Sequence, residues 1–143
     1  MSARDGNLRS VFKSHIKSAL WVPIESWAVS GPGIPDSHYL FKGGASGWVE
    51  FKTVKKGDRV PTLKKEQAAW LGRYARLGGR CFLATRVGDD ELVLHSGIDA
   101  TLVRQSGLRE ARPLGRFSGG PRGWNWAHIE QWLKQPPSPP PAT

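Results

Sequence analysis

Residues 36–54 constrain the fold more than any other part of the sequence, because they have the pattern of a β-hairpin. Residues 36–42 and 47–54 favour extended structure, and the glycine-rich residues 43–46 between them suit a tight connection. The preceding residues 30–35 combine glycine and proline, which cannot continue a helix or a central strand. We therefore expect a turn followed by two antiparallel strands.

The second of these strands has two different faces. Successive side chains of a strand point to opposite sides, so its residues divide into two sets. One set is Trp48, Glu50 and Lys52, and the other is Val49, Phe51 and Thr53. One face belongs to a core, whereas the other bears a carboxylate and an amine two residues apart.

The first 95 residues alternate helical and extended patterns. A helix is expected over residues 8–20, an extended stretch over 21–29, a helix over 62–77, and paired strands over 80–87 and 91–95. Thr62 is the expected N-cap of the second helix, and Gly78 and Gly79 are expected to end it. The core order is therefore αβββαββ.

The C-terminal third is less regular. We expect a short helix over residues 98–105, a mobile basic loop over the Gly-, Pro- and Arg-rich residues 112–123, and a helix over 126–134 that packs through Ile129 and Leu133. In the second helix we expect four residues to lie in the core rather than to stack on bases: Trp70, Leu71, Tyr74 and Leu77.

The length of 143 residues fits one domain, which we expect to span residues 1–135. Residues 136–143 are rich in proline and predict an extended or disordered tail. Cys81 is the only cysteine, which excludes an intramolecular disulfide and a cysteine-based zinc site. No apolar run is long enough to span a membrane and no cleavage signal follows the N-terminus, so we expect a cytoplasmic protein that is not secreted.

The charge of the chain points to an anionic partner. It has 21 Lys and Arg residues against 12 Asp and Glu residues, a formal net charge of +9. Such a charge concentrates polyanions around a protein, which makes nucleic acid the first candidate partner. The alternative from charge alone is a basic protein without such a partner.

Two carboxylates carry the most specific chemical signal. The hairpin returns Asp36, at the start of its first strand, to the side of Glu50 in the second. Like charges at that range repel unless a cation joins them, and carboxylate oxygens suit Mg²⁺ or Mn²⁺. Such a site can activate water for attack on a phosphodiester, with Lys52 placed to orient the water or contact the phosphate. The alternative interpretation is that Asp36 is a turn residue and that Glu50 and Lys52 lie on a solvated strand face.

Four segments together resemble the PD-(D/E)xK nuclease superfamily, in particular the small phage and bacterial nucleases of the VRR-NUC and Holliday-junction-resolvase-like type. They are Gly33-Ile34-Pro35-Asp36, Gly47-Trp48-Val49-Glu50-Phe51-Lys52-Thr53, Lys65-Glu66-Gln67-Ala68-Ala69-Trp70-Leu71 and Gly78-Gly79-Arg80. The likeness covers residues 8–95. It implies an α/β (α+β) fold of the restriction-endonuclease type, with an αβββαβ core and a mixed central sheet flanked by helices.

The resemblance also implies roles for particular residues. Asp36, Glu50 and the backbone carbonyl of Phe51 would bind Mg²⁺, with Mn²⁺ as a substitute, and Lys52 would be the catalytic lysine. An earlier carboxylate often joins such sites, and Glu25 is the candidate, with Glu66 and Asp58 as weaker alternatives. Gln67 would hold a water or a phosphate near the site.

The implied activity is hydrolysis of DNA phosphodiester bonds, with branched DNA as a candidate substrate and a second copy of the chain as a candidate partner in cutting both strands. The basic residues expected to contact DNA phosphates are Lys55, Lys56, Arg59, Lys64 and Lys65. The competing hypothesis is a basic nucleic-acid-binding module without catalysis, which leaves the pattern of Asp36, Glu50 and Lys52 unexplained.

Overall fold

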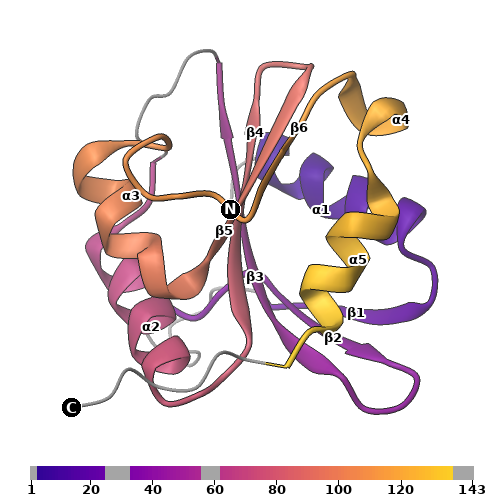
Figure 1. The fold of residues 1–143 in the computed structure, drawn as a ribbon, viewed down its shortest axis with the longest axis horizontal. Coiled ribbons are helices and arrows are strands. Elements are labelled where there is room, and N and C mark those ends of the chain that lie inside the picture. Colours follow the sequence, from indigo (N-terminus) through magenta and orange to yellow (C-terminus); the bar gives the residue numbers. More distant parts are fainter. Residues whose placement is uncertain (1–2, 25–32, 56–61, 137–143) are drawn as a thin grey trace.

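A six-stranded mixed sheet runs through the middle of the protein, with helices on both faces (Figure 1). The computed structural model describes residues 3–24, 33–55 and 62–136. The strand order is β1-β2-β3-β4-β5-β6, and neighbouring strands are antiparallel except for β3 and β4, which are parallel. The parallel pair is possible because helix α2 crosses over between its two strands.

The elements follow one another along the chain in this order. They are α1 (Ala3–His15), β1 (Ala19–Pro23), β2 (Ser37–Phe41), β3 (Ser46–Val54), α2 (Lys65–Arg76), β4 (Cys81–Val87), β5 (Glu91–Ser96), a 3₁₀ turn (Gly97–Asp99), α3 (Ala100–Ser106), β6 (Gly115–Phe117), α4 (Gly120–Gly123) and α5 (Trp126–Lys134). The predicted αβββαββ order of the first 96 residues is confirmed, as are the mixed sheet and its flanking helices.

Helices cover both faces of the sheet, so β3 is buried on each side. Helices α2 and α3 lie on one side of the sheet in Figure 1, and α1 and α5 lie on the other. Phe51 belongs to the core on the α1 and α5 side, where Ile129 and Leu133 of α5 are fully buried as predicted. Leu71 belongs to the second core, on the α2 and α3 side. The face that bears Glu50 and Lys52 is therefore an interior face.

The first helix ends five residues earlier than predicted, at His15 rather than at Leu20. Residues 19 and 20 instead begin strand β1, in which residues 21–23 are extended as predicted, and the backbone of β1 pairs with β2 along its whole length. Leu20 faces outward from this strand and is 62% exposed. Sheet pairing with a distant segment thus overrides the helical periodicity of the local sequence. Of the extended stretch predicted over residues 21–29, the part from residue 25 lies outside the described residues.

The prediction of a mobile loop over residues 112–123 is wrong. This segment contains β6, which pairs with β5, and the short helix α4. Arg116 of β6 forms an ion pair with Glu91 at 3.0 Å, and the backbone N–H of Gly119 donates to the Asp90 carboxylate at 2.9 Å. Contacts with the β4–β5 hairpin hold this glycine- and proline-rich segment in an ordered structure. No local sequence pattern predicts these contacts.

Two details of α2 also differ from prediction. The N-cap is Lys64 rather than Thr62, because the side-chain oxygen of Gln67 accepts a hydrogen bond from the Lys64 backbone N–H at 2.9 Å. Leu77, predicted in the core, is 78% exposed at the C-cap. The stop at Gly78 is confirmed, since this residue has a φ of +94°, which favours glycine.

Gly47 at the start of β3 leaves no room for a side chain. A Cβ there would lie 2.5 Å from the carbonyl oxygen of Arg80 and 2.6 Å from the hydroxyl of Tyr39. That hydroxyl is buried and donates to the Leu133 carbonyl of α5 at 2.6 Å. We expect Gly47→Ala to lower the free energy of unfolding by about 1–3 kcal/mol, the usual cost of overpacking.

Gly72→Ala in α2 is the matched control, measured in parallel by urea denaturation. Its added methyl group would first meet the flexible guanidinium end of Arg76, at 3.1 Å. Alanine is favoured over glycine in a helix by about 1 kcal/mol, so this variant should be neutral or stabilised. Equal stabilities of the two variants would contradict the close packing at Gly47.

Candidate functional site

The structure brings Asp36, Glu50 and Lys52 together on the face of the sheet that α2 covers. Ser37 pairs with Val49 in the antiparallel register of β2 and β3, and continuing this register places Asp36 opposite Glu50. Lys52 follows two residues later on the same face of β3. Asp36 is 9% exposed, Glu50 1% and Lys52 6%, so the alternative interpretation of a solvated strand face is wrong.

Asp36 is fixed at the end of β2 by backbone groups on both sides. Its carbonyl accepts from Ile24 N–H at 2.7 Å, and its side-chain Oδ2 accepts from Phe51 N–H at 3.0 Å. The N–H and C=O of one strand residue point toward the same neighbouring strand. The Phe51 carbonyl therefore faces the same edge of β3 as the Asp36 carboxylate.

Glu50 has one engaged oxygen and one unpaired oxygen. Its Oε2 lies 3.4 Å from Lys52 Nζ and accepts from Gln67 Nε2 at 3.3 Å. Its Oε1 is buried and has no hydrogen-bond partner among the described residues. A buried carboxylate oxygen without a donor is costly, because it has lost its water and gained no partner.

Burial raises the pKa of the Glu50 carboxyl to about 8. The neighbouring charge of Asp36 adds to this rise, and the ammonium of Lys52 opposes it. One lysine does not compensate two adjacent buried carboxylates, so Glu50 keeps a proton at neutral pH. A divalent cation at this position would displace that proton and remove the repulsion.

Helix α2 lies against the site through one close backbone contact. Gly33, with a φ of +88°, lies against the Glu66 carbonyl, which leaves no space for a Cβ. This contact holds the segment leading to Asp36 beside the first turn of α2. The role of Gly33 was not predicted, and its only signal in the sequence is a glycine three residues before the aspartate.

Gln67 links the cap of α2 to the site. Its Oε1 accepts from the Lys64 backbone, as described above, and its Nε2 donates to Glu50. Both ends of its amide are therefore engaged. The predicted position near the site is observed, but the side chain contacts a carboxylate rather than being free for a water or a phosphate.

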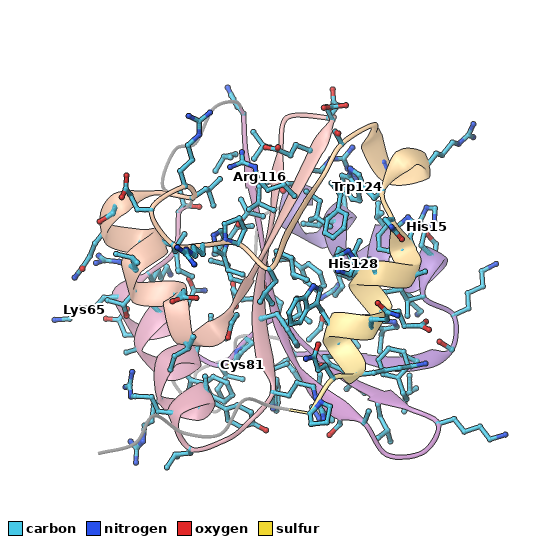
Figure 2. The ribbon with its side chains drawn as sticks, in the orientation of Figure 1. His15, Lys65, Cys81, Arg116, Trp124 and His128 are labelled. Atoms are coloured by element: carbon cyan, nitrogen blue, oxygen red, sulfur yellow. The ribbon has the colours of Figure 1, made fainter. Side chains whose placement is uncertain are left out.

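The predicted basic residues fall into two groups. Lys55, Lys64 and Lys65 are exposed, at the end of β3 and at the start of α2, and Figure 2 shows Lys65 pointing away from the sheet. Lys56 and Arg59 lie outside the described residues. Lys55, Lys64 and Lys65 are thus close to the site in the sequence, but their exposed side chains do not enter it.

Among the residues that it describes, the structure does not show a third carboxylate beside Asp36 and Glu50. Glu25 and Asp58 lie outside the described residues, and Glu66 is exposed in the first turn of α2. Within the described ranges, no group of three or more His, Cys, Asp or Glu side chains could hold a metal ion. The available donors are two carboxylates and the Phe51 carbonyl, all hard oxygens, and Mg²⁺ commonly takes one or two carboxylates and keeps several waters. The residues present therefore fit such an ion.

The raised pKa of Glu50 predicts that stability falls as pH rises. In the unfolded chain this carboxyl titrates near 4.5, so between about pH 4.5 and 8 the folded state holds a proton that the unfolded state lacks. The stabilisation is complete below that window and is lost through it, by up to about 1.4 kcal/mol per pH unit. Burial lowers the pKa of His95, so its unfolded form binds more protons near pH 6.5 and this group alone would make stability rise by at most about 0.4 kcal/mol between pH 6.5 and 8.

The measurement is urea denaturation without divalent cations at pH 6.5 and pH 8. Wild type should lose up to about 2 kcal/mol over this interval, the limit for one proton. Glu50→Gln, which mimics the protonated group, should lose much less. A parallel pH dependence in the two proteins would show that Glu50 is ionised in the folded state at pH 6.5.

Beyond the site itself, no helix of the described ranges is long and apolar enough to cross a membrane. No protein-family model matches this sequence, and no curated protein matches it.

Proposed function

We propose that this protein is a metal-dependent nuclease that hydrolyses DNA phosphodiester bonds, with Asp36, Glu50 and Lys52 as its catalytic residues. The observation that carries the proposal is the burial of two adjacent carboxylates with one amine at the end of a hairpin. The resemblance to the PD-(D/E)xK superfamily supports it, because the same three residues carry that likeness.

Asp36, Glu50 and the Phe51 carbonyl would hold the ion, which is Mg²⁺ or its substitute Mn²⁺. When bound, the ion offsets the negative charge that grows on the phosphodiester and makes water a better nucleophile. Glu50 would contribute its unpaired Oε1, while Gln67 keeps Oε2 in place. Asp36 is held by the Phe51 N–H, so its carboxylate needs little reorganisation to bind a cation.

Lys52 would act on the substrate side of the carboxylates. Its ammonium is a compact group with three donors, and at 3.4 Å from Glu50 Oε2 it borders the same space. There it would orient the attacking water or neutralise a phosphate oxygen. Its low exposure excludes most bulk water, which strengthens either interaction.

The charge of the chain supports a nucleic-acid partner. The exposed Lys55, Lys64 and Lys65 flank the site and would neutralise phosphates, which fixes the register of the strand rather than reading its sequence. Branched DNA as the preferred substrate, and a pair of subunits that cuts both strands, remain proposals based on the resemblance.

One observation favours the competing function, a nucleic-acid-binding module without catalysis. Lys52 Nζ and Gln67 Nε2 both contact Glu50 Oε2, at 3.4 Å and 3.3 Å, as the members of a purely structural interior network would. Such a network does not need a metal. The two functions therefore differ in their response to divalent cations.

Metal dependence is the first expected outcome. Purified protein should cleave labelled linear, flapped or four-way DNA with Mg²⁺ or Mn²⁺, and excess chelator should abolish cleavage. Asp36→Asn and Glu50→Gln, which keep the shape of the site, should each slow cleavage by at least about 10²-fold, because each removes an electrostatic contact made in the transition state. DNA affinity measured without divalent cations should change little.

Glu110→Gln is the matched control for these variants, since this exposed carboxylate lies outside the site. A readout independent of activity is thermal stability: Mg²⁺ should raise the Tm of wild type more at pH 8 than at pH 6.5, and should not raise that of Asp36→Asn. Cleavage that persists in excess chelator would overturn the metal dependence of the site, whereas DNA binding without any cleavage would favour the binding module.

Lys52→Arg separates a catalytic amine from a general positive charge. Arginine keeps the charge but is longer and planar, so it does not reproduce a compact amine in this buried space. We expect it to cleave about 10²-fold more slowly than wild type, in the range of proton-transfer effects, with DNA affinity preserved. Circular dichroism checks its folding, and near-normal cleavage would mean that Lys52 serves as a phosphate contact.

A further inference from the structure

A pocket of about 250 Å³ lies just beyond the carboxyl ends of the parallel strands β3 and β4. Its lining includes Asn7 of α1, Thr53 and Lys55 from the end of β3, and Arg86, Gly88 and Asp89 from the end of β4. In open sheets with parallel strands, ligands commonly bind in the crevice outside the carboxyl ends of these strands. The pocket therefore has the position of a binding site.

Apart from Val54, which belongs to the core on the α2 side, the side chains of the pocket lining that come from β3 and β4 lie on the opposite face of the sheet from Glu50 and Lys52. Thr53 follows Lys52 directly and so points to the other side of β3, where it pairs with Arg86 in the register of β3 and β4. Arg86 lies under Trp124, which Figure 2 places on the side of the sheet that carries His15 and His128. The same strand thus borders both sites, one on each face.

Arg86 is held in place at this pocket. Its guanidinium carbon lies 5.6 Å from the centre of the Trp124 ring, which is itself anchored by a hydrogen bond from its Nε1 to the Asp90 carbonyl. Its Nη2 lies 4.0 Å from the Asp89 carboxylate and donates to the Asp89 carbonyl at 3.4 Å. Stacking on an aromatic ring pre-orients a guanidinium, which lowers the entropy lost when it binds an anion.

Two polar groups beside the pocket lack partners. The Nε of Arg86 and the hydroxyl of Thr53 are buried and form no hydrogen bond with the described residues. The lining also offers the exposed ammonium of Lys55 and the amide of Asn7. One guanidinium and one ammonium against one carboxylate, that of Asp89, leave a formal charge of about +1. A set of donors with excess positive charge suits an oxyanion.

We propose that this pocket binds a phosphate group of the polynucleotide backbone, as a second contact with the strand that the carboxylate site acts on. The assignment to nucleic acid rests on the proposed function. Lys55 and Arg86 would bind the phosphate oxygens, while Asp89, whose side chain is fully solvent-exposed, limits the affinity. The contact would hold the polynucleotide strand around the end of β3, and it would fix the register of that polynucleotide without reading its sequence.

The test uses two exposed lining residues with opposite expected effects. Binding of a single-stranded oligonucleotide is measured in the Asp36→Asn background without divalent cations, so that cleavage plays no part. Lys55→Gln should weaken binding roughly fivefold and lower the slope of log K against log salt by about 0.7, the value for one phosphate contact on a single strand. Asp89→Asn should tighten binding roughly threefold, because it removes the repulsion next to the phosphate.

Matched controls remove the same charges elsewhere. Lys17→Gln and Glu110→Gln each change an exposed residue outside the pocket lining and should shift affinity less than the corresponding pocket variant. Loss of packing cannot explain a gain of binding in Asp89→Asn, so this variant separates a phosphate contact from structural damage.

Equal effects of pocket and control variants would overturn the proposal and leave the carboxylate site untouched. A second arm measures the Tm with inorganic pyrophosphate. Stabilisation of wild type but not of Lys55→Gln, without oligonucleotide binding, would overturn the assignment to nucleic acid and mark a site for a small phosphorylated ligand. Binding of neither ligand would overturn the pocket as an anion site.

Discussion

The rest of the structure depends on the burial of β3 on both faces. The strand supplies Phe51 to one core and lies under α2 on its other face, where Glu50 is 1% exposed. Alternation along β3 predicts that Glu50 and Lys52 lie outside the core. Because α2 covers their face of the strand, both side chains are instead enclosed. Enclosure raises the pKa of Glu50 and leaves its Oε1 unpaired. A carboxyl group in this state keeps its proton at neutral pH, and binding of a cation would displace that proton.

The sequence predicts the elements whose patterns are local. The hairpin of β2 and β3, the strands β4 and β5 and the helix α5 follow from alternation, turn residues and amphipathic spacing, and all are observed. The contact of Asp36 with β3 also follows, since a hairpin register is fixed by its turn. Sequence patterns of this kind therefore predict most of the fold that positions the candidate site.

The remaining features depend on contacts between segments far apart in the chain. Residues 19 and 20 are predicted as the end of a helix but pair with β2, and residues 115–117 are predicted as a loop but pair with β5. The burial of Lys52 depends on the cover provided by α2, and the stacking of Arg86 on Trp124 joins residues 38 positions apart. No periodicity encodes such contacts, because each one depends on the packing of the complete sheet.

Strand β1 has features that limit the pairing of a further strand with the edge of the sheet. Among the described strands it forms one edge, and it presents the exposed side chains of Leu20 and Val22 next to a row of backbone groups. An apolar edge of this kind is a template on which a strand from another molecule can add. Here the strand is only five residues long and ends at Pro23, which has no N–H to offer. This short, proline-terminated edge limits edge-to-edge pairing beside the exposed side chains of Leu20 and Val22.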